Sequence, residues 1–252
     1  MGQGVSSSSA AAGQSQLKGI QKYASAVEDR PWVEAIRSDS YLDWKLQYNK
    51  SDDKAAMYQH AMSQQEMPVA ITPQLFVADA EAAHNIAKLQ QLGITAVLNM
   101  AGKAAAPPSR TVRAYAKANI AYKSIRAEDR EGYPLLDLHW EEAQQFLKQQ
   151  TSSSKQKVVV HCKMGLNRSC LVAAAFHLSM SSSASSNGNS HNDSTNQYRN
   201  VIETVRLIRS KRGNSALSNH SFQEQLVAFA RLSKQLGPHP VFLSTAAVDS
   251  HN

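Results

Sequence analysis

Residues 155–169 read Lys-Gln-Lys-Val-Val-Val-His-Cys-Lys-Met-Gly-Leu-Asn-Arg-Ser, and the largely apolar run from Cys170 to Met180 follows them. The consecutive valines at 158–160 predict a buried strand, and the alanine-rich residues 171–180 predict a helix. Between them lies a short loop that contains Gly165. The stretch therefore predicts a strand, a loop and the N-terminus of a helix.

The predicted loop has the properties of an anion-binding site. A loop that enters a helix gathers unpaired backbone N–H groups at the positive end of the helix dipole. Cys162 opens this loop, where the amides and Arg168 favour the thiolate, which is the nucleophilic form of cysteine. Arg168 begins the helix, and its planar fork can bind two phosphate oxygens at once. Ser169 can donate its hydroxyl to the sulfur, so the sequence predicts a cysteine nucleophile beside a phosphate site.

The pattern His161-Cys162-x5-Arg168-Ser169 resembles the signature of the cysteine-dependent protein tyrosine phosphatase superfamily. Gly165, three residues after the cysteine, resembles the dual-specificity branch. The alternative is a buried structural cysteine beside an unrelated arginine, but the position between a valine strand and a helix favours the signature. The resemblance implies an α/β fold with a central, mostly parallel twisted sheet flanked by helices, and the phosphate loop between the last core strand and a helix. It implies that His161 supports this loop and that the loop residues bind phosphate: Lys163, Met164, Gly165, Leu166, Asn167 and Arg168.

Other segments extend the resemblance over about residues 69–236. Residues 71–77 and 93–99 resemble the opening strand and the second core strand of dual-specificity phosphatases, and 219–226 resemble their closing helix. We expect a disordered tail at 1–16, a helical extension at 17–66, a catalytic domain at 67–236 and a loose tail at 237–252. The extension could pack on the catalytic domain or form a docking arm. The chain departs from the family in this extension, in a low-complexity serine-rich insertion at 181–195, and at Asn167.

Between these segments the pattern predicts regular elements. We expect helices at 81–92, 111–117 and about 138–149, strands at 94–100 and 120–125, and a helix that begins near Val201. Gly93 should end the first of these helices. The basic residues 206–212 suit the dipole at a helix end, and we interpret them as a solvated surface.

The reaction also needs a proton donor, because an alkoxide or phenoxide is a poor leaving group. In the family this acid lies on a mobile loop after the strand that precedes the helix at about 138–149, and Asp129 matches that position. A charged run such as 128–131 is otherwise simply solvated. Asp137 is the competitor, and we interpret it as the N-cap of the following helix. The implied cycle forms a cysteinyl-phosphate on Cys162 and hydrolyses it with water activated by Asp129, with Ser169 helping the thiolate to leave.

The resemblance implies a phosphatase that acts on phosphotyrosine, phosphoserine and phosphothreonine in proteins. No segment resembles the loop that deepens the pocket of strictly tyrosine-specific enzymes, which implies a cleft open to all three. Residues 161–165 resemble the slingshot phosphatases in particular. No cofactor is implied, and no metal-ligand cluster is visible, so we expect no metal.

Other functions on the same loop stay open. Residues 165–168 resemble the loop of the cysteine-type RNA capping enzymes, which are RNA 5′-triphosphatases, but those loops continue with Thr-Gly where this chain has Ser169-Cys170. Phosphoinositides and other small phosphoesters are further alternatives. A non-catalytic phosphobinding module would commonly lack the cysteine, which is present here.

Composition and charge set the remaining bounds. The chain has 252 residues, of which 42% are hydrophobic, which suits one domain with extensions. Its formal charge of +7 suits an anionic partner, whether phosphoprotein, lipid surface or nucleic acid, and selects none of them. A disulfide between Cys162 and Cys170, the two cysteines, would disable the nucleophile, so we expect a reducing, cytoplasmic setting.

The N-terminus suggests a lipid anchor. Residues 1–6, Met-Gly-Gln-Gly-Val-Ser, fit the N-myristoylation pattern with Gly2 as the acceptor, although a flexible tail could begin with the same residues. One myristoyl chain holds a protein to a membrane only reversibly. The chain has no hydrophobic signal segment and no apolar run of about eighteen residues, so we expect a soluble or peripherally attached protein.

Overall fold

The computed structural model describes residues 21–38, 66–180 and 199–240. They contain a five-stranded sheet with the order β1-β2-β5-β3-β4. β1 is antiparallel to β2, and the other neighbours are parallel. The expected α/β fold with a mostly parallel sheet is confirmed. The strands are β1 (Val69–Ala70), β2 (Leu75–Ala78), β3 (Ala96–Asn99), β4 (Ala121–Ser124) and β5 (Val158–His161).

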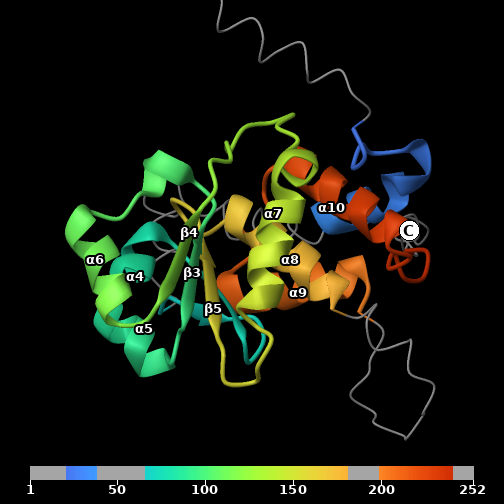
Figure 1. The fold of residues 1–252 in the computed structure, drawn as a ribbon. Helices are drawn as coiled ribbons and strands as arrows, with labels where there is room; N and C mark the ends of the chain where they lie inside the picture. The colour runs from blue at the N-terminus through green and yellow to red at the C-terminus, as the bar shows by residue number, and fades with distance from the viewer. Residues whose placement is uncertain (1–20, 39–65, 181–198, 241–252) are drawn as a thin grey trace, which may run out of the picture.

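Helices cover both faces of the sheet (Figure 1). One face carries α4 (Ala80–His84), α5 (Ile86–Leu92) and α6 (Ser109–Lys117), and the 3-10 helix η3 (Gly102–Ala105) precedes α6. The other face carries α7 (Leu135–Gln149) and α8 (Arg168–Ser179), with α9 (Val201–Arg212) and α10 (His220–Leu232) beyond them.

The valines of β5 explain why this strand lies at the centre. Val159 packs in the hydrophobic cluster under α4, α5 and α6, whereas Val158 and Val160 pack in the larger cluster under α7 and α8. Successive side chains of a strand point to opposite faces, so a strand buried on both sides must be apolar at every position. The three consecutive valines of β5 meet that requirement.

Two local predictions were wrong. The helix predicted at 81–92 is interrupted at Asn85, whose side chain accepts a hydrogen bond from the backbone N–H of Lys88 and caps α5. α7 begins at Leu135 rather than near residue 138, so Asp137 lies within its first turn and is not the N-cap. The carboxylate of Asp137 instead accepts the backbone N–H of Tyr23 at 3.0 Å. The end of α5 at Gly93, in the left-handed conformation, is confirmed.

The described part of the N-terminal extension packs against α10 (Figure 1). It contains the 3-10 helix η2 (Val27–Asp29) and helical residues 30–38. The Tyr23 ring lies 5.6 Å from that of Phe229, and buried Asp29 pairs with Arg231 at 2.8 Å. Residues 21–38 therefore pack on the sheet-bearing part of the chain. Gly2, the predicted tail 1–16, the insertion 181–195 and residues 39–65 and 241–252 lie outside the described residues.

Candidate active site

The predicted site residues follow the carboxyl ends of two parallel strands, β5 and β4, which lie on either side of β3. β5 ends at His161 and delivers Cys162, while β4 ends at Ser124 and leads into the loop that contains Asp129. The carboxyl ends of parallel strands share one edge of a sheet, which is where α/β proteins bind ligands. The fold therefore brings the predicted nucleophile and the predicted acid to the same edge.

The phosphate loop, residues 162–168, needs its glycine. Gly165 has a φ of +66°, and a Cβ on it would lie 2.7 Å from the backbone carbonyl of Ala78. The loop is also tied to this part of the chain by the backbone N–H of Ala80, which donates to the carbonyl of Lys163 at 3.2 Å. A side chain at position 165 would strain the backbone and push the loop off the end of β2.

Arg212 holds the opposite side of the phosphate loop. Its guanidinium donates to the carbonyls of Gly165 and Met164, both at 3.0 Å, and the residue is 1% exposed. Arg209 is also buried and donates to the carbonyl of Ile36 at 2.7 Å. The interpretation of 206–212 as a solvated surface is therefore wrong for these two arginines, since backbone carbonyls replace water around their charge.

The N-terminus of α8 carries no side-chain cap. Asn167 occupies the cap position, but its Oδ1 accepts hydrogen bonds from Ser218 Oγ at 3.2 Å and from the backbone N–H of Asn219 at 3.1 Å. Asn167 thus joins the phosphate loop to the start of α10, which gives a physical role to this departure from the family pattern. The first N–H groups of α8 are not taken by a cap, so an anion can bind them.

The two cysteines have different surroundings. Cys162 is 1% exposed, and its Sγ lies 3.3 Å from Ser169 Oγ. Cys170 lies beneath the loop and contacts the carbonyl of Gly165 at 3.5 Å. Burial raises the pKa of the Cys170 thiol to about 12, so Cys170 stays protonated near neutral pH. Of the two cysteines, Cys162 therefore stays the predicted nucleophile.

The guanidinium of Arg168 is buried with an unused donor. Its Nη1 donates to the carbonyl of Ala127 at 3.2 Å, while its Nε has no hydrogen-bond partner among the described residues. The Nε lies 3.5 Å from Asp129 Oδ2, which is an ion-pair distance. A buried donor without a partner is costly, and an oxyanion at the mouth of the loop would satisfy it.

Asp129 lies beside this guanidinium and remains accessible, with 29% of its side chain exposed. Its Oδ1 is 3.5 Å from the side-chain amide of Asn219. The carboxylate is therefore held between Arg168 of the phosphate loop and the residue that caps α10. Of the predicted residues, Cys162, Arg168, Ser169 and Asp129 thus come together.

His161 is enclosed below the loop. Its Nδ1 lies 3.2 Å from the carbonyl of Cys162, and its ring meets the ring of His84 edge to face at 5.8 Å. Burial lowers the pKa of His161 to about 4. Burial, followed by the charge of Arg199, lowers the pKa of His177 in α8 to about 4 as well.

These buried histidines predict acid sensitivity. An unfolded histidine titrates near 6.5, so the folded state resists protonation and loses stability as the pH falls from about 6.5 towards 4. We expect each histidine to remove about 2 kcal/mol from the free energy of unfolding between about pH 7 and pH 5. Urea unfolding of the parent and of His177→Gln at both pH values measures this. Equal losses in the two proteins would contradict the contribution of His177.

Three polar residues around the site were not predicted from the sequence: Arg212, Asn219 and Glu131. Arg212 follows Val205 and Ile208 at helical spacing, so the buried face of α9 could have indicated it. Asn219 precedes a helix at the position that favours asparagine. No local sequence pattern indicated a role for Glu131, because its partners lie 89 and 90 residues away in the sequence.

Comparison with known proteins agrees with this geometry. The family model for the dual specificity phosphatase catalytic domain matches residues 75–232. Human dual specificity protein phosphatase 26 is 27% identical over 168 residues, covering 66% of this chain and 68% of that protein. Rat protein phosphatase Slingshot homolog 3 is 30% identical over 115 residues, which cover 46% of this chain and 16% of that protein.

The solved structures show the same fold. The crystal structure of a variant of human DUSP28 superimposes with a TM-score of 0.51 at 20% identity, covering 67% of this chain and 98% of that one. The matched family residues run from the first residue of β2 to the last residue of α10, and they contain the phosphate loop and Asp129. This chain belongs to the family of dual specificity phosphatases.

Proposed function

We propose that the site hydrolyses phosphotyrosine, phosphoserine and phosphothreonine in proteins through a cysteinyl-phosphate on Cys162. Membership of the family makes the chain a protein phosphatase with phosphorylated proteins as substrates. The observation that carries the assignment of residues is the position of the Arg168 guanidinium. Its Nε makes no hydrogen bond among the described residues and lies 3.5 Å from the carboxylate of Asp129.

In the first step, the Cys162 thiolate attacks phosphorus while Arg168 and the N–H groups of the loop bind the non-bridging oxygens. The P–O bond to the leaving group breaks, and Asp129 gives its proton to that oxygen. In the second step, ionised Asp129 takes a proton from water, which attacks the cysteinyl-phosphate. The Ser169 hydroxyl, 3.3 Å from the sulfur, stabilises the departing thiolate.

The role of Asp129 predicts a dependence on the leaving group. We expect Asp129→Asn to lower kcat/KM, which reports the formation of the cysteinyl-phosphate, by about 10²- to 10³-fold on phenyl phosphate. The loss on p-nitrophenyl phosphate should be much smaller, because nitrophenolate leaves without a proton. Steady-state kinetics on the two esters measure this difference. Equal losses on both, with unchanged folding, would contradict the role of Asp129 as the acid.

We further propose that the catalytic domain spans residues 67–236, preceded by an extension at 17–66, and that the protein is cytoplasmic with reversible membrane contact through Gly2. Among the described residues, no helix is long and apolar enough to cross a membrane. The motif at 1–6 supports the lipid anchor. The mass of the native N-terminal peptide tests it, and an unmodified Gly2 would contradict it.

A further inference from the structure

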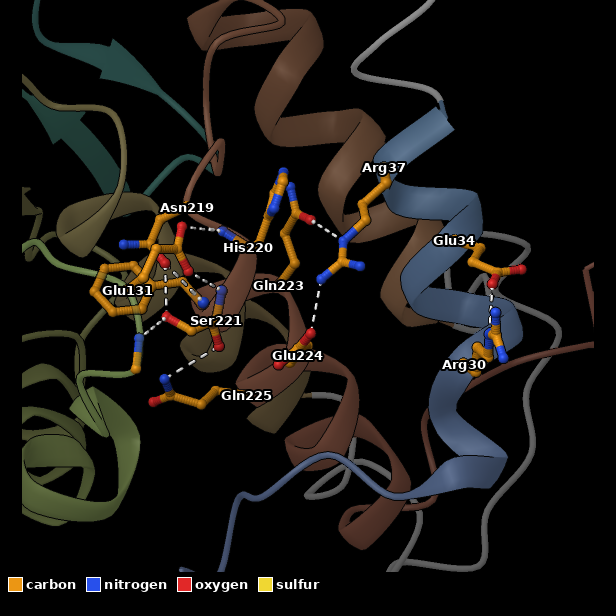
Figure 2. Close-up of polar contacts among 12 residues, drawn as sticks. Arg30, Glu34, Arg37, Glu131, Asn219, His220, Ser221, Gln223, Glu224 and Gln225 are labelled. Carbon is orange, nitrogen blue, oxygen red and sulfur yellow. Dashed lines mark hydrogen bonds and ion pairs between the residues drawn. The ribbon is translucent and has the colours of Figure 1, made fainter.

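Glu131, two residues after Asp129, is bound to the first turn of α10. One carboxylate oxygen accepts the backbone N–H of His220 at 3.0 Å, and the other accepts the backbone N–H of Ser221 at 2.9 Å (Figure 2). These N–H groups belong to the start of a helix of 13 residues and have no partner within it. Partial burial opposes ionisation, but the hydrogen bonds from Ser221 and His220 prevail and lower the pKa of Glu131. The carboxylate is therefore ionised near neutral pH and complements the helix dipole.

Two further contacts fasten the same loop to the same turn. The backbone N–H of Gly132 donates to Ser221 Oγ at 3.0 Å. The side-chain amide of Asn219 reaches Asp129 at 3.5 Å, and its Oδ1 accepts from Ser221 Oγ at 2.8 Å. Residues 129, 131 and 132 of the acid loop thus contact the consecutive residues 219–221.

The start of α10 is in turn fixed to the phosphate loop. The backbone N–H of Asn219 donates to Asn167 Oδ1, and the backbone N–H of Leu217 donates to the carbonyl of Leu166 at 2.9 Å. On the far side of α10, Arg37 of the N-terminal helical segment contacts Gln223 and Glu224 (Figure 2). The helix is consequently held on both sides. Its first turn contacts both the phosphate loop and the acid loop and can fix their positions relative to each other.

The acid loop has little apolar packing of its own. Residues 128–132 are all exposed, and a Cβ placed on Gly132 would meet no atom within 4 Å. Polar contacts must then set the position of the loop, and Glu131 supplies two of them, at 3.0 and 2.9 Å. A small displacement of a catalytic group is costly in rate, because proton transfer requires hydrogen-bond geometry.

We propose that Glu131 is a positioning residue for the reaction: by binding the N-terminus of α10, it holds Asp129 over the phosphate loop. This inference rests on the proposed role of Asp129 as the proton donor. The hydrogen bonds of the Glu131 carboxylate go to α10, so Glu131 acts on the reaction through the position of Asp129. Its contribution should therefore appear only in the steps that use Asp129.

The test compares the parent with Glu131→Ala and Glu131→Gln on phenyl phosphate and p-nitrophenyl phosphate. We expect Glu131→Ala to lower kcat/KM on phenyl phosphate by about tenfold to thirtyfold, with a smaller loss of kcat/KM on p-nitrophenyl phosphate. Glu131→Gln retains one acceptor oxygen and should lie between the parent and Glu131→Ala. Glu203→Ala is the matched control, because Glu203 also lies in the first turn of a helix, α9, but pairs with Arg206.

The double variant Glu131→Ala/Asp129→Asn separates positioning from a general structural effect. If Glu131 acts through Asp129, the double variant should be no slower than Asp129→Asn alone. Multiplied losses in the double variant, or equal losses of Glu131→Ala on the two esters, would overturn the proposal. The affinity for vanadate, an analogue of phosphate, should stay within about twofold of the parent, which checks that the phosphate loop is intact.

The same measurements distinguish this proposal from the assignment of the acid. Full activity of Asp129→Asn on phenyl phosphate would overturn the role of Asp129 and, with it, that of Glu131. If the Asp129→Asn variant lost activity on phenyl phosphate while the Glu131→Ala variant kept the activity of the parent, only the positioning role of Glu131 would be overturned.

Discussion

Replacement of Cys162 with serine is expected to abolish turnover, with a loss on the order of 10⁵-fold or more, as for other enzymes deprived of their nucleophile. A serine hydroxyl is not ionised near neutral pH, and Ser169 Oγ, the hydrogen-bond partner of the Cys162 sulfur, is itself a hydroxyl and not a base. The substitution is nearly isosteric at a residue that is 1% exposed, so the loop and its phosphate site should persist. Phosphate release from a phosphopeptide measures the loss.

Cys170→Ser is the matched control for this experiment. Cys170 is equally buried, and serine can keep the contact with the carbonyl of Gly165. We expect this variant to retain most of the parent turnover, while Cys162→Ser binds phosphopeptide without hydrolysing it. Substantial turnover by the folded Cys162→Ser variant would contradict the role of Cys162 as the nucleophile.

The second large effect is expected for Arg168→Lys, which should lower kcat/KM by about 10³-fold. Lysine keeps the charge, but it cannot present two parallel N–H donors to phosphate. It would also lose the bond from Nη1 to the carbonyl of Ala127, which ties the phosphate loop to the acid loop. The value of kcat/KM on p-nitrophenyl phosphate and the affinity for vanadate should fall together, because both depend on the two N–H donors of the guanidinium.

Arg30→Lys provides the comparison for the arginine. The Arg30 side chain is 78% exposed and pairs with Glu34 on the surface of the N-terminal helical segment (Figure 2). This control should keep its activity and its affinity for vanadate. If Arg168→Lys behaved in the same way, phosphate recognition would have to lie elsewhere in the site.

The sequence predicted the parts of the site that are local along the chain. The valine strand, the glycine turn and the start of α8 lie within residues 158–168, and each is determined by its own residues: apolar side chains on both faces of β5, a positive φ at Gly165, and helix formers after Arg168. Asp129 could be selected because it matches the position of the acid in the dual-specificity family, on the loop after the strand that precedes α7.

What the sequence did not predict depends on distant partners. Arg212 looked like a solvated helix end because nothing local shows that the carbonyls of Met164 and Gly165 surround it. Asp137 resembled an N-cap, but Pro134 and Leu135 already begin the helix, and the backbone of Tyr23 uses the carboxylate. The extension could not be assigned to a position, since Asp29 finds Arg231 only in the folded chain.

The most direct test of the account is rapid acid quenching of the Asp129→Asn variant with p-nitrophenyl phosphate, followed by mass spectrometry of its peptides. The good leaving group needs no acid, whereas hydrolysis of the intermediate lacks its base, so the intermediate should accumulate. We expect one phosphoryl group on the peptide that contains Cys162, and none on this peptide in the Cys162→Ser variant. Turnover of the ester without a phosphorylated cysteine at any quench time would contradict covalent catalysis at Cys162.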